Sequence, residues 1–306
     1  MGAAASESEI FAPGLLSGQV ALVTGGGTGL GKASALELAR CGATVVIAGR
    51  REEVLAEAAR EIGERCKGGE HPEAGEHPEA GEHPEAGEPS GQVDWAAGDV
   101  RTPDGAEALV RTVLERHGRL DALVNNAGGQ YFTPAELIAV KGWRAVWRLN
   151  VGGILNMCEA AFDLAFKPAG AGTIVNVTLS PHHGMPGMAH SGAARATVEA
   201  LTRELAIRWA DAGIVVTAVA AGHFGTEVTA KYPESVRAGA ARSVPLQRLG
   251  EAQEHAWLVA LLASPLGRAL NGSTVTLDGA RDNWFGPWPP AGLADESGQV
   301  PTEERR

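Results

Sequence analysis

A glycine-rich run near the start of the chain has the residue types and spacing to bind a diphosphate. It reads Thr24-Gly25-Gly26-Gly27-Thr28-Gly29-Leu30-Gly31-Lys32, with an apolar run at 20–24 before it and a helical stretch at 33–40 after it. Glycines let the backbone approach a pyrophosphate, and a helix N-terminus offers it unpaired N–H groups and a positive dipole end. We therefore predict a dinucleotide site, whose pyrophosphate is bound by Thr24, Gly25, Thr28, Gly29, Leu30 and Gly31.

Two arginines, Arg50 and Arg51, directly follow the second strand-like run. An acidic side chain at this place would bind the 2'-hydroxyl of the adenosine ribose, whereas arginine favours a 2'-phosphate. The sequence thus favours NADPH as the cofactor. The alternative is that both arginines are simply solvated at the start of a helix.

Apolar runs alternate with helical stretches along the whole chain. The strand-like runs are residues 20–24, 44–48, 93–97, 122–125, 173–177, 214–218 and 274–277. Continuous apolar strands separated by helices predict a parallel sheet that is covered on both faces. The expected fold class is α/β, a single doubly wound Rossmann domain over residues 15–282. Residues 1–14 would form an arm, and 283–306 a Trp- and Pro-rich tail that covers the site, packs on another subunit or packs on its own core.

Charge and composition narrow the choice of partners. The 306 residues carry a formal net charge of −11, and 44% are apolar. Nucleic acid or an anionic membrane would need a basic face, so a small-molecule substrate is the expected partner. The three cysteines lack metal or disulfide spacing, and the chain has neither a long apolar run nor a signal peptide at its start. These features predict a cytoplasmic protein.

Residues 70–89 contain tandem copies of Glu-His-Pro-Glu-Ala-Gly. Three histidines at six-residue spacing could suggest metal binding. Proline and glycine in every unit, together with repulsion between the acidic side chains, instead predict a disordered insertion over 68–90. It precedes the third strand, at the edge of the sheet opposite to the one where such folds bind ligands. We therefore expect no metal site.

The glycine spacing and the turn Asn125-Asn126-Ala127-Gly128 together resemble the classical short-chain dehydrogenase/reductase family over roughly residues 15–282. The resemblance implies further cofactor contacts after successive strands. It assigns the adenine to Asp99 and Val100, and the nicotinamide amide to the segment from Gly222 through Phe224 to Thr226. The turn residues Asn126, Ala127 and Gly128 would also contact the cofactor. A homotetramer or homodimer is implied as well.

The same family carries its chemistry on a Tyr that acts as acid or base and a Lys four residues later that holds the nicotinamide ribose. Alignment on the segment 195–198 places Ser191 at the Tyr position and Arg195 at the Lys position. Arg195 can hold a ribose hydroxyl, but a guanidinium does not release a proton in proteins. The pair that relays protons in the family is therefore replaced.

The resemblance also assigns an oxygen-binding serine and an asparagine. Asn150 matches the asparagine, while Thr178 and Ser180 both stand near the expected serine. The proton donor is open: a histidine at the ligand edge titrates in the useful range. The candidates are a water, Tyr131 and the three histidines in or beside the loop after the fifth strand, His182, His183 and His190.

Local motifs narrow the reaction. The segments 128–132, 134–136, 141–143 and 190–195 resemble the trans-2-enoyl-CoA reductases, and dienoyl-CoA reductases look similar. Reducing a ketone creates a localised alkoxide that needs an acid of matched pKa. Reducing an enoyl thioester instead spreads charge into an enolate, which hydrogen bonds from Asn150 and Ser191 would stabilise. One departure is Glu199, which stands where the enoyl reductases have a Tyr.

We therefore expect an NADPH-dependent reductase of a conjugated double bond, acting on an acyl-CoA, a carrier-bound acyl group or a free unsaturated carbonyl compound. Two alternatives remain. One is an alcohol or carbonyl oxidoreductase with a substituted acid. The other is a non-redox enzyme or a nucleotide-binding protein on the same fold, because a fold does not determine its function.

Overall fold

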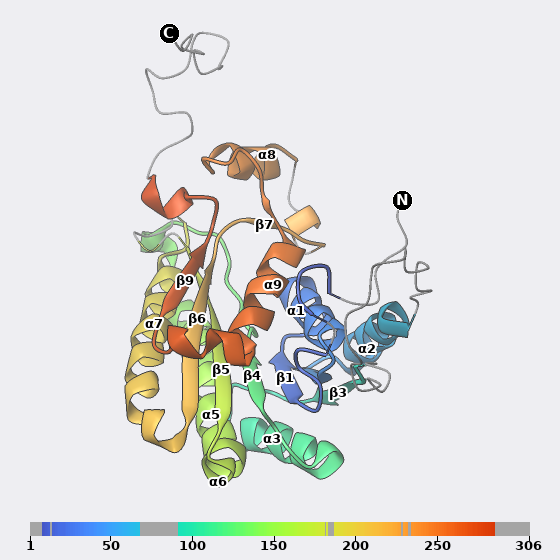
Figure 1. Ribbon diagram of the computed structural model, residues 1–306. Coiled ribbons are helices and arrows are strands. Elements are labelled where there is room, and N and C mark those ends of the chain that lie inside the picture. Colours follow the sequence, from blue (N-terminus) through green and yellow to red (C-terminus); the bar gives the residue numbers. More distant parts are fainter. Residues whose placement is uncertain are drawn as a thin grey trace, which may run out of the picture.

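The computed structural model is built around one parallel sheet of seven strands in the order β3-β2-β1-β4-β5-β6-β9 (Figure 1). It describes residues 8–12, 14–67, 91–180, 182, 187–227, 229–231 and 234–284. The acidic repeat, His183 and the tail from residue 285 lie outside the described residues. The order in which β1 lies between β2 and β4 is that of a doubly wound fold, so the predicted fold class is confirmed.

The strands lie close to where the apolar runs predicted them. Their bounds are β1 Val20–Thr24, β2 Thr44–Gly49, β3 Val93–Ala97, β4 Ala122–Asn125, β5 Gly172–Leu179, β6 Ile214–Ala221 and β9 Thr274–Leu277, with a separate pair β7 Phe224–Gly225 and β8 Gly250–Glu251. Strand β2 is one residue longer than predicted, and β5 and β6 are each three residues longer, because β5 and β6 pair continuously from Gly172 with Ile214 to Leu179 with Ala221. This extension carries Thr178 and Leu179 to the edge where the strands end.

Helices cover both faces of the sheet. Their bounds are α1 Gly29–Arg40, α2 Glu52–Lys67, α3 Pro103–His117, α4 Val140–Trp147, α5 Gly153–Ala161, α6 Lys167–Ala169, α7 Ala189–Arg208, α8 Glu234–Arg242 and α9 Ala252–Ala263. One apolar core lies between the sheet and α3, α5 and α7, and a second lies between the sheet and α1, α2 and α9. Helix α8 stands beyond the carboxyl end of β6, at the top of Figure 1.

Short helical turns connect these elements. The 3-10 helices are Ala135–Leu137, Ala210–Ala212, Thr229–Lys231, Pro265–Leu270 and Arg281–Asn283. The π-helical segments are Arg148–Gly152 and Phe162–Phe166. Local sequence explains some helix ends. The Thr102 side chain accepts a hydrogen bond from Gly105 N, Pro103 opens α3, and Gly118 ends it in the left-handed conformation. These are the signals by which helices usually begin and end.

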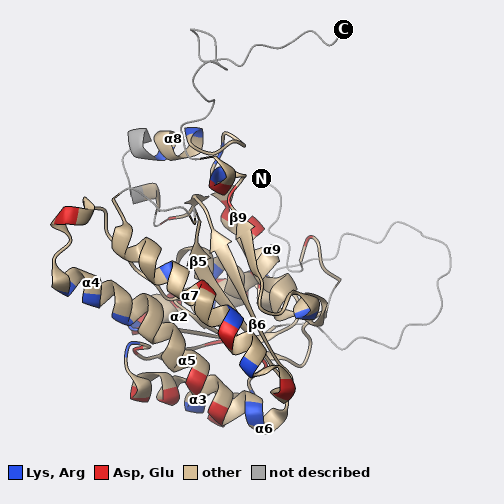
Figure 2. Cartoon of the chain, turned by 90° about the vertical axis from the view of Figure 1, so that its left-hand side faces the viewer, with Lys and Arg blue, Asp and Glu red and all other residues tan. Residues whose placement is uncertain are grey.

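Figure 2 colours the ribbon by residue charge, and acidic and basic residues both occur along α3 and α7. On these two helices, acidic residues thus interrupt the basic ones, whereas nucleic-acid-binding proteins usually present a continuous basic stripe. No helix among the described residues is both long and apolar enough to cross a membrane. All three cysteines are free.

Candidate active site

A cleft of about 430 Å³ opens at the carboxyl edge of the sheet. It is lined where β1, β2, β3, β4, β5 and β6 end, which is the place where doubly wound folds bind ligands. Most of the predicted cofactor residues line it: Gly25, Thr28, Gly29, Leu30, Arg50, Arg51, Asp99, Val100, Asn126, Ala127, Gly128, Arg195, Gly222, Phe224 and Thr226. The structure thus brings together residues from nearly the full length of the domain.

Thr24 and Gly31 are the two predicted cofactor residues that are not part of the lining. The Thr24 hydroxyl accepts hydrogen bonds from the backbone N–H groups of Asn126 and Ala127, both at 3.1 Å. A Cβ on Gly31 would lie 2.4 Å from Gly25 O. Both residues therefore hold the glycine-rich loop against the end of β4, and they act on a ligand only through that loop.

The glycine-rich loop has backbone geometry that requires glycine. Gly25 has a φ of +68° and Gly29 a φ of +56°, a region that residues with a Cβ rarely adopt. At the N-terminus of α1, the Gly29 N–H donates to Glu227 Oε1 at 2.7 Å. A carboxylate therefore lies where the helix dipole and the free N–H groups favour an anion.

The end of the cleft that lies after β2 and β3 carries opposite charges. Arg50 and Arg51 are exposed on its rim, beside Asp99. Arg101 Nε donates to both Asp99 oxygens, at 2.8 and 2.9 Å. That hydrogen-bonded pair lowers the pKa of Asp99 to about 2, with a smaller contribution from the charge of Arg50. Asp99 is thus ionised and anchored, while both arginines face the cleft.

Arg195 reaches the opposite end of the cleft from α7. Its Nη1 donates to Val177 O at 2.7 Å, and Arg195 is only 8% exposed. Burial lowers the pKa of Arg195 to about 10, so the guanidinium still carries its charge at neutral pH. A Cβ on Gly128 would lie 2.2 Å from Arg195 Nη2. The absence of a side chain at Gly128 thus makes room for this cation.

Asn150 contacts the backbone of the loop that follows β4. It lies in the π-helical segment between α4 and α5, and such segments often occur at functional sites. Its Nδ2 donates to Gly129 O at 3.0 Å, and its Oδ1 accepts from Gly129 N at 2.9 Å. Because both amide atoms are engaged with this one backbone, Asn150 fixes the loop after β4.

His190 and Ser191 are completely buried at the start of α7. Neither ring nitrogen of His190 nor the Ser191 hydroxyl has a hydrogen-bond partner among the described residues. The His190 ring packs edge-on against Tyr131, with 4.5 Å between centroids, and against Trp143 at 6.1 Å. Buried polar atoms are nearly always hydrogen-bonded, so the unpaired atoms of these two side chains are candidates for hydrogen bonds to a ligand.

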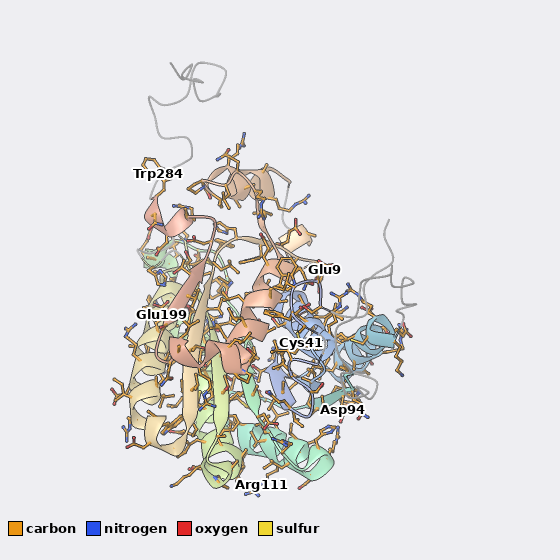
Figure 3. All side chains as sticks on the ribbon, in the orientation of Figure 1. Glu9, Cys41, Asp94, Arg111, Glu199 and Trp284 are labelled. Carbon is orange, nitrogen blue, oxygen red and sulfur yellow. The ribbon has the colours of Figure 1, made fainter. Side chains whose placement is uncertain are left out.

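The residues around the end of β5 form a linked polar cluster. Glu199 Oε1 accepts a hydrogen bond from Thr178 Oγ1 at 3.1 Å and lies 3.0 Å from His182 Nε2. In Figure 3, Glu199 lies at the opposite side of the molecule from Asp94, which marks the β3 edge. Of the two serine candidates, Thr178 lines the cleft, whereas Ser180 is hydrogen-bonded to Asp278 and lies outside the lining.

Sequence reasoning missed several residues at this edge, including Glu227, Asp278 and Asp282. Asp278 directly follows β9, and the carboxyl ends of parallel strands share one edge, so its position was a usable signal. Nothing local marks Glu227, because its contact joins residues 198 positions apart. No group of three or more metal-ligating side chains occurs in the part of the chain that the structure describes.

The lining fits a dinucleotide. The glycine-rich loop leaves room for a pyrophosphate, and the Gly29 N–H already holds an anionic group. Arg50 and Arg51 would face the adenosine end of such a ligand, and Arg195 its nicotinamide ribose. The lining is therefore cationic at both ends of the cleft, with the glycine-rich loop between them, and this suits a nicotinamide dinucleotide.

Comparisons with known proteins agree with this geometry. A family model described as "short chain dehydrogenase" matches residues 19–72, and one described as "Enoyl-(Acyl carrier protein) reductase" matches residues 76–280. The chain is 34% identical to a peroxisomal 2,4-dienoyl-CoA reductase of Danio rerio over 280 residues, covering 89% of this chain and 84% of that protein. It is also 34% identical to a probable 2,4-dienoyl-CoA reductase of Bacillus subtilis over 273 residues, covering 88% and 97%.

A solved structure extends the similarity to the fold. The citronellol catabolism dehydrogenase of Pseudomonas aeruginosa PAO1 shares 37% sequence identity with a TM-score of 0.73, covering 89% of this chain and 98% of that one. Both family models and these relatives span the cleft and the strands that build it. The chain therefore belongs to the short-chain dehydrogenase/reductase family and is an oxidoreductase of that family.

Proposed function

We propose that the chain is an NADPH-dependent reductase that acts on the conjugated double bond of an enoyl thioester or a related α,β-unsaturated carbonyl compound. The observation that carries the proposal is the buried, unpartnered pair His190 and Ser191. Ser191 lies one helical turn before Arg195, and residues four apart share a face of a helix. Ser191 is itself completely buried and does not line the cleft, so a substrate beside Arg195 would meet its hydroxyl once the wall between them moves.

The choice of cofactor rests on charge. Arg50 and Arg51 lie on the rim of the cleft directly after β2, at the position where an acidic side chain would bind the ribose 2'-hydroxyl. Arginine binds phosphate oxygens through charge-assisted hydrogen bonds, which favours the 2'-phosphate of NADPH. The bound cofactor would supply the hydride. Arg195 would hold its ribose, because this guanidinium is fixed by Val177 O beside Gly128.

The choice of substrate rests on which charge the site can stabilise. Hydride addition to the β-carbon spreads negative charge into the carbonyl oxygen of a thioester. The Ser191 hydroxyl and an N–H of the His190 ring are the donors available to that oxygen, and such hydrogen bonds are usually the largest catalytic contribution. Asn150 supports this indirectly by holding Gly129 in place. The names of the two 2,4-dienoyl-CoA reductases point to the same substrate class.

A second candidate is an alcohol or carbonyl oxidoreductase. The name of the dehydrogenase from Pseudomonas aeruginosa, with 37% identity, favours it. This reaction needs a proton donor of matched pKa at the reacting oxygen. Ser191 and Arg195 do not supply one, so a histidine would have to do so.

One assay separates these functions. The protein is mixed with NADPH and either crotonyl-CoA, a 2,4-dienoyl-CoA or a panel of ketones, and the nicotinamide absorbance is followed. Turnover with the enoyl thioesters alone supports the proposal, and turnover with ketones alone favours the second candidate. NADPH binding without oxidation on any substrate would exclude both redox functions and leave a non-redox or binding role.

We also propose a homodimer or homotetramer that works in the cytoplasm on a small-molecule substrate, either an acyl-CoA or a carrier-bound acyl group. Exposed apolar side chains on and beside α4 support self-association: Leu137, Val140 and Trp147 are 69%, 65% and 42% exposed. Large exposed apolar patches usually mark interaction surfaces. Light scattering after gel filtration gives the mass that tests this prediction.

A further inference from the structure

The imidazole of His182 lies between two carboxylates from different elements. Its Nε2 is 3.0 Å from Glu199 Oε1 on α7, and its Nδ1 is 2.6 Å from Asp282 Oδ2 in the 3-10 turn after β9. Its backbone N–H also donates to Asp282 Oδ1 at 2.6 Å. A neutral imidazole has only one N–H, so an acceptor at each ring nitrogen suits the doubly protonated ring.

This cluster connects the cofactor cleft to solvent. At the inner end, Glu199 is only 8% exposed, and its Oε1 accepts the hydrogen bond from Thr178, which lines the cleft. At the outer end, the His182 side chain is 27% exposed. One carboxylate oxygen therefore contacts both the hydroxyl in the cleft wall and the imidazole at the surface.

Asp282, the carboxylate that contacts His182 Nδ1, is itself held by a hydrogen bond. The Asp282 N–H donates to Asp278 Oδ2 at 2.7 Å, and the same oxygen accepts the hydrogen bond from Ser180 at the end of β5. The end of β5 and the segment after β9 are thereby tied together on either side of His182. The imidazole is thus positioned directly by Glu199 and Asp282, and Asp278 holds Asp282 in place.

We propose that His182 is the proton-loading residue of this enzyme and that Glu199 and Thr178 conduct its proton to the substrate. This inference rests on the proposed double-bond reduction. The hydride joins the β-carbon. The Thr178 hydroxyl turns from Glu199 to the α-carbon and gives it a proton, and Glu199 passes to Thr178 the proton that it receives from His182. His182 then takes one proton from solvent, so each turnover consumes one NADPH and one proton.

The charges around His182 support this role. Burial alone would lower the pKa of His182, but the hydrogen bond to Asp282 and the charge of Glu199 outweigh it and raise that pKa. The charged groups that face the ring are thus Glu199 from α7 and Asp282 from the turn after β9. The ring is therefore charged over a wider pH range than a free histidine, whose pKa is about 6.5.

The test compares His182→Gln with His117→Gln. Glutamine keeps a donor near Glu199 but cannot titrate, and His117 pairs with Asp94 at the far edge of the sheet. We expect His182→Gln to lower kcat for enoyl reduction by about 10²-fold, the usual contribution of a positioned acid or base. In His182→Gln, the NADPH affinity, measured by fluorescence titration, and the KM for the enoyl substrate should stay unchanged. The His117→Gln enzyme should have the kcat, KM and NADPH affinity of the wild type.

The pH profile separates a proton role from a structural one. Because His182 must be protonated to donate, the wild-type kcat should fall as pH rises through its raised pKa, and this limb should be absent in His182→Gln. As a readout independent of turnover, NMR of the His182 ring should show its pKa falling in Glu199→Gln. If His182→Gln keeps the wild-type kcat and pH limb, the relay is wrong while the proposed function stands. If the wild type reduces no enoyl thioester, the proposed function fails, and the relay fails with it.

Discussion

The carboxylate of Glu227 accepts a hydrogen bond from the backbone N–H of Gly29, with 2.7 Å between oxygen and nitrogen. Gly29 opens α1, so this carboxylate lies at the helix end where a pyrophosphate would bind. Glu227 follows Thr226, which lines the same cleft. The segment after β7 therefore places a negative charge in competition with the cofactor.

Removing that charge should strengthen cofactor binding. We expect Glu227→Gln to tighten NADPH binding by about 1 kcal/mol, roughly fivefold in Kd, which is the size of a charge effect at a helix terminus. Fluorescence titration of NADPH measures Kd. The matched control is Glu115→Gln, which removes an exposed carboxylate from α3. Equal or weaker NADPH binding by Glu227→Gln would show that the carboxylate does not compete.

The two rim arginines should decide between the cofactors. We expect Arg50→Ala combined with Arg51→Ala to weaken NADPH binding by at least about tenfold, because each charged hydrogen bond contributes about 1.5 to 3 kcal/mol. NADH has no 2'-phosphate, so its Kd should stay unchanged. Parallel titrations with both cofactors measure this difference. An equal loss for both would mean that the arginines support the fold of the cleft.

Two neighbouring glycines offer a matched pair for the role of Arg195. A Cβ on Gly128 would lie 2.2 Å from Arg195 Nη2, whereas one on Gly129 would meet only Leu149 Cδ2 at 3.3 Å. We expect Gly128→Ala to displace the guanidinium and weaken NADPH binding, with little change in Tm, because a side-chain end can move. Gly129→Ala should bind NADPH as the wild type does. Equal affinities in the two variants would contradict the assigned position of Arg195.

Two buried serines separate a substrate-binding hydroxyl from a structural one. Ser191 has no partner among the described residues, whereas Ser34 donates to Leu30 O and lies 3.3 Å from His255 Nδ1. We expect Ser191→Ala to keep its Tm and lose about 10²-fold in kcat for enoyl reduction, the usual cost of one oxyanion donor. Ser34→Ala should do the opposite, lowering Tm and keeping kcat. If Ser191→Ala has a lower Tm but the kcat of the wild type, the Ser191 hydroxyl stabilises the fold and does not bind the substrate.

Much of the fold could be predicted because its signals are local. The seven apolar runs became the seven strands of the sheet, and their alternation with helices indicated parallel pairing. The prediction ended β5 and β6 too early, because continuous pairing between those strands, rather than local composition, sets their length. Asn150 was predicted as a site residue, but its pairing with Gly129 depends on a π-helical segment that no sequence period indicates.

The sequence by itself determined which segments line the cleft at the carboxyl edge of the sheet. The glycine-rich loop, the rim arginines and the strand ends are each specified by short segments, and a parallel sheet brings such segments to one edge. Only the tertiary structure decided how the polar groups pair. Glu227 with Gly29, and His182 with Asp282, are contacts across 198 and 100 residues. Such pairs depend on how loops pack over the sheet, and no local pattern records that packing.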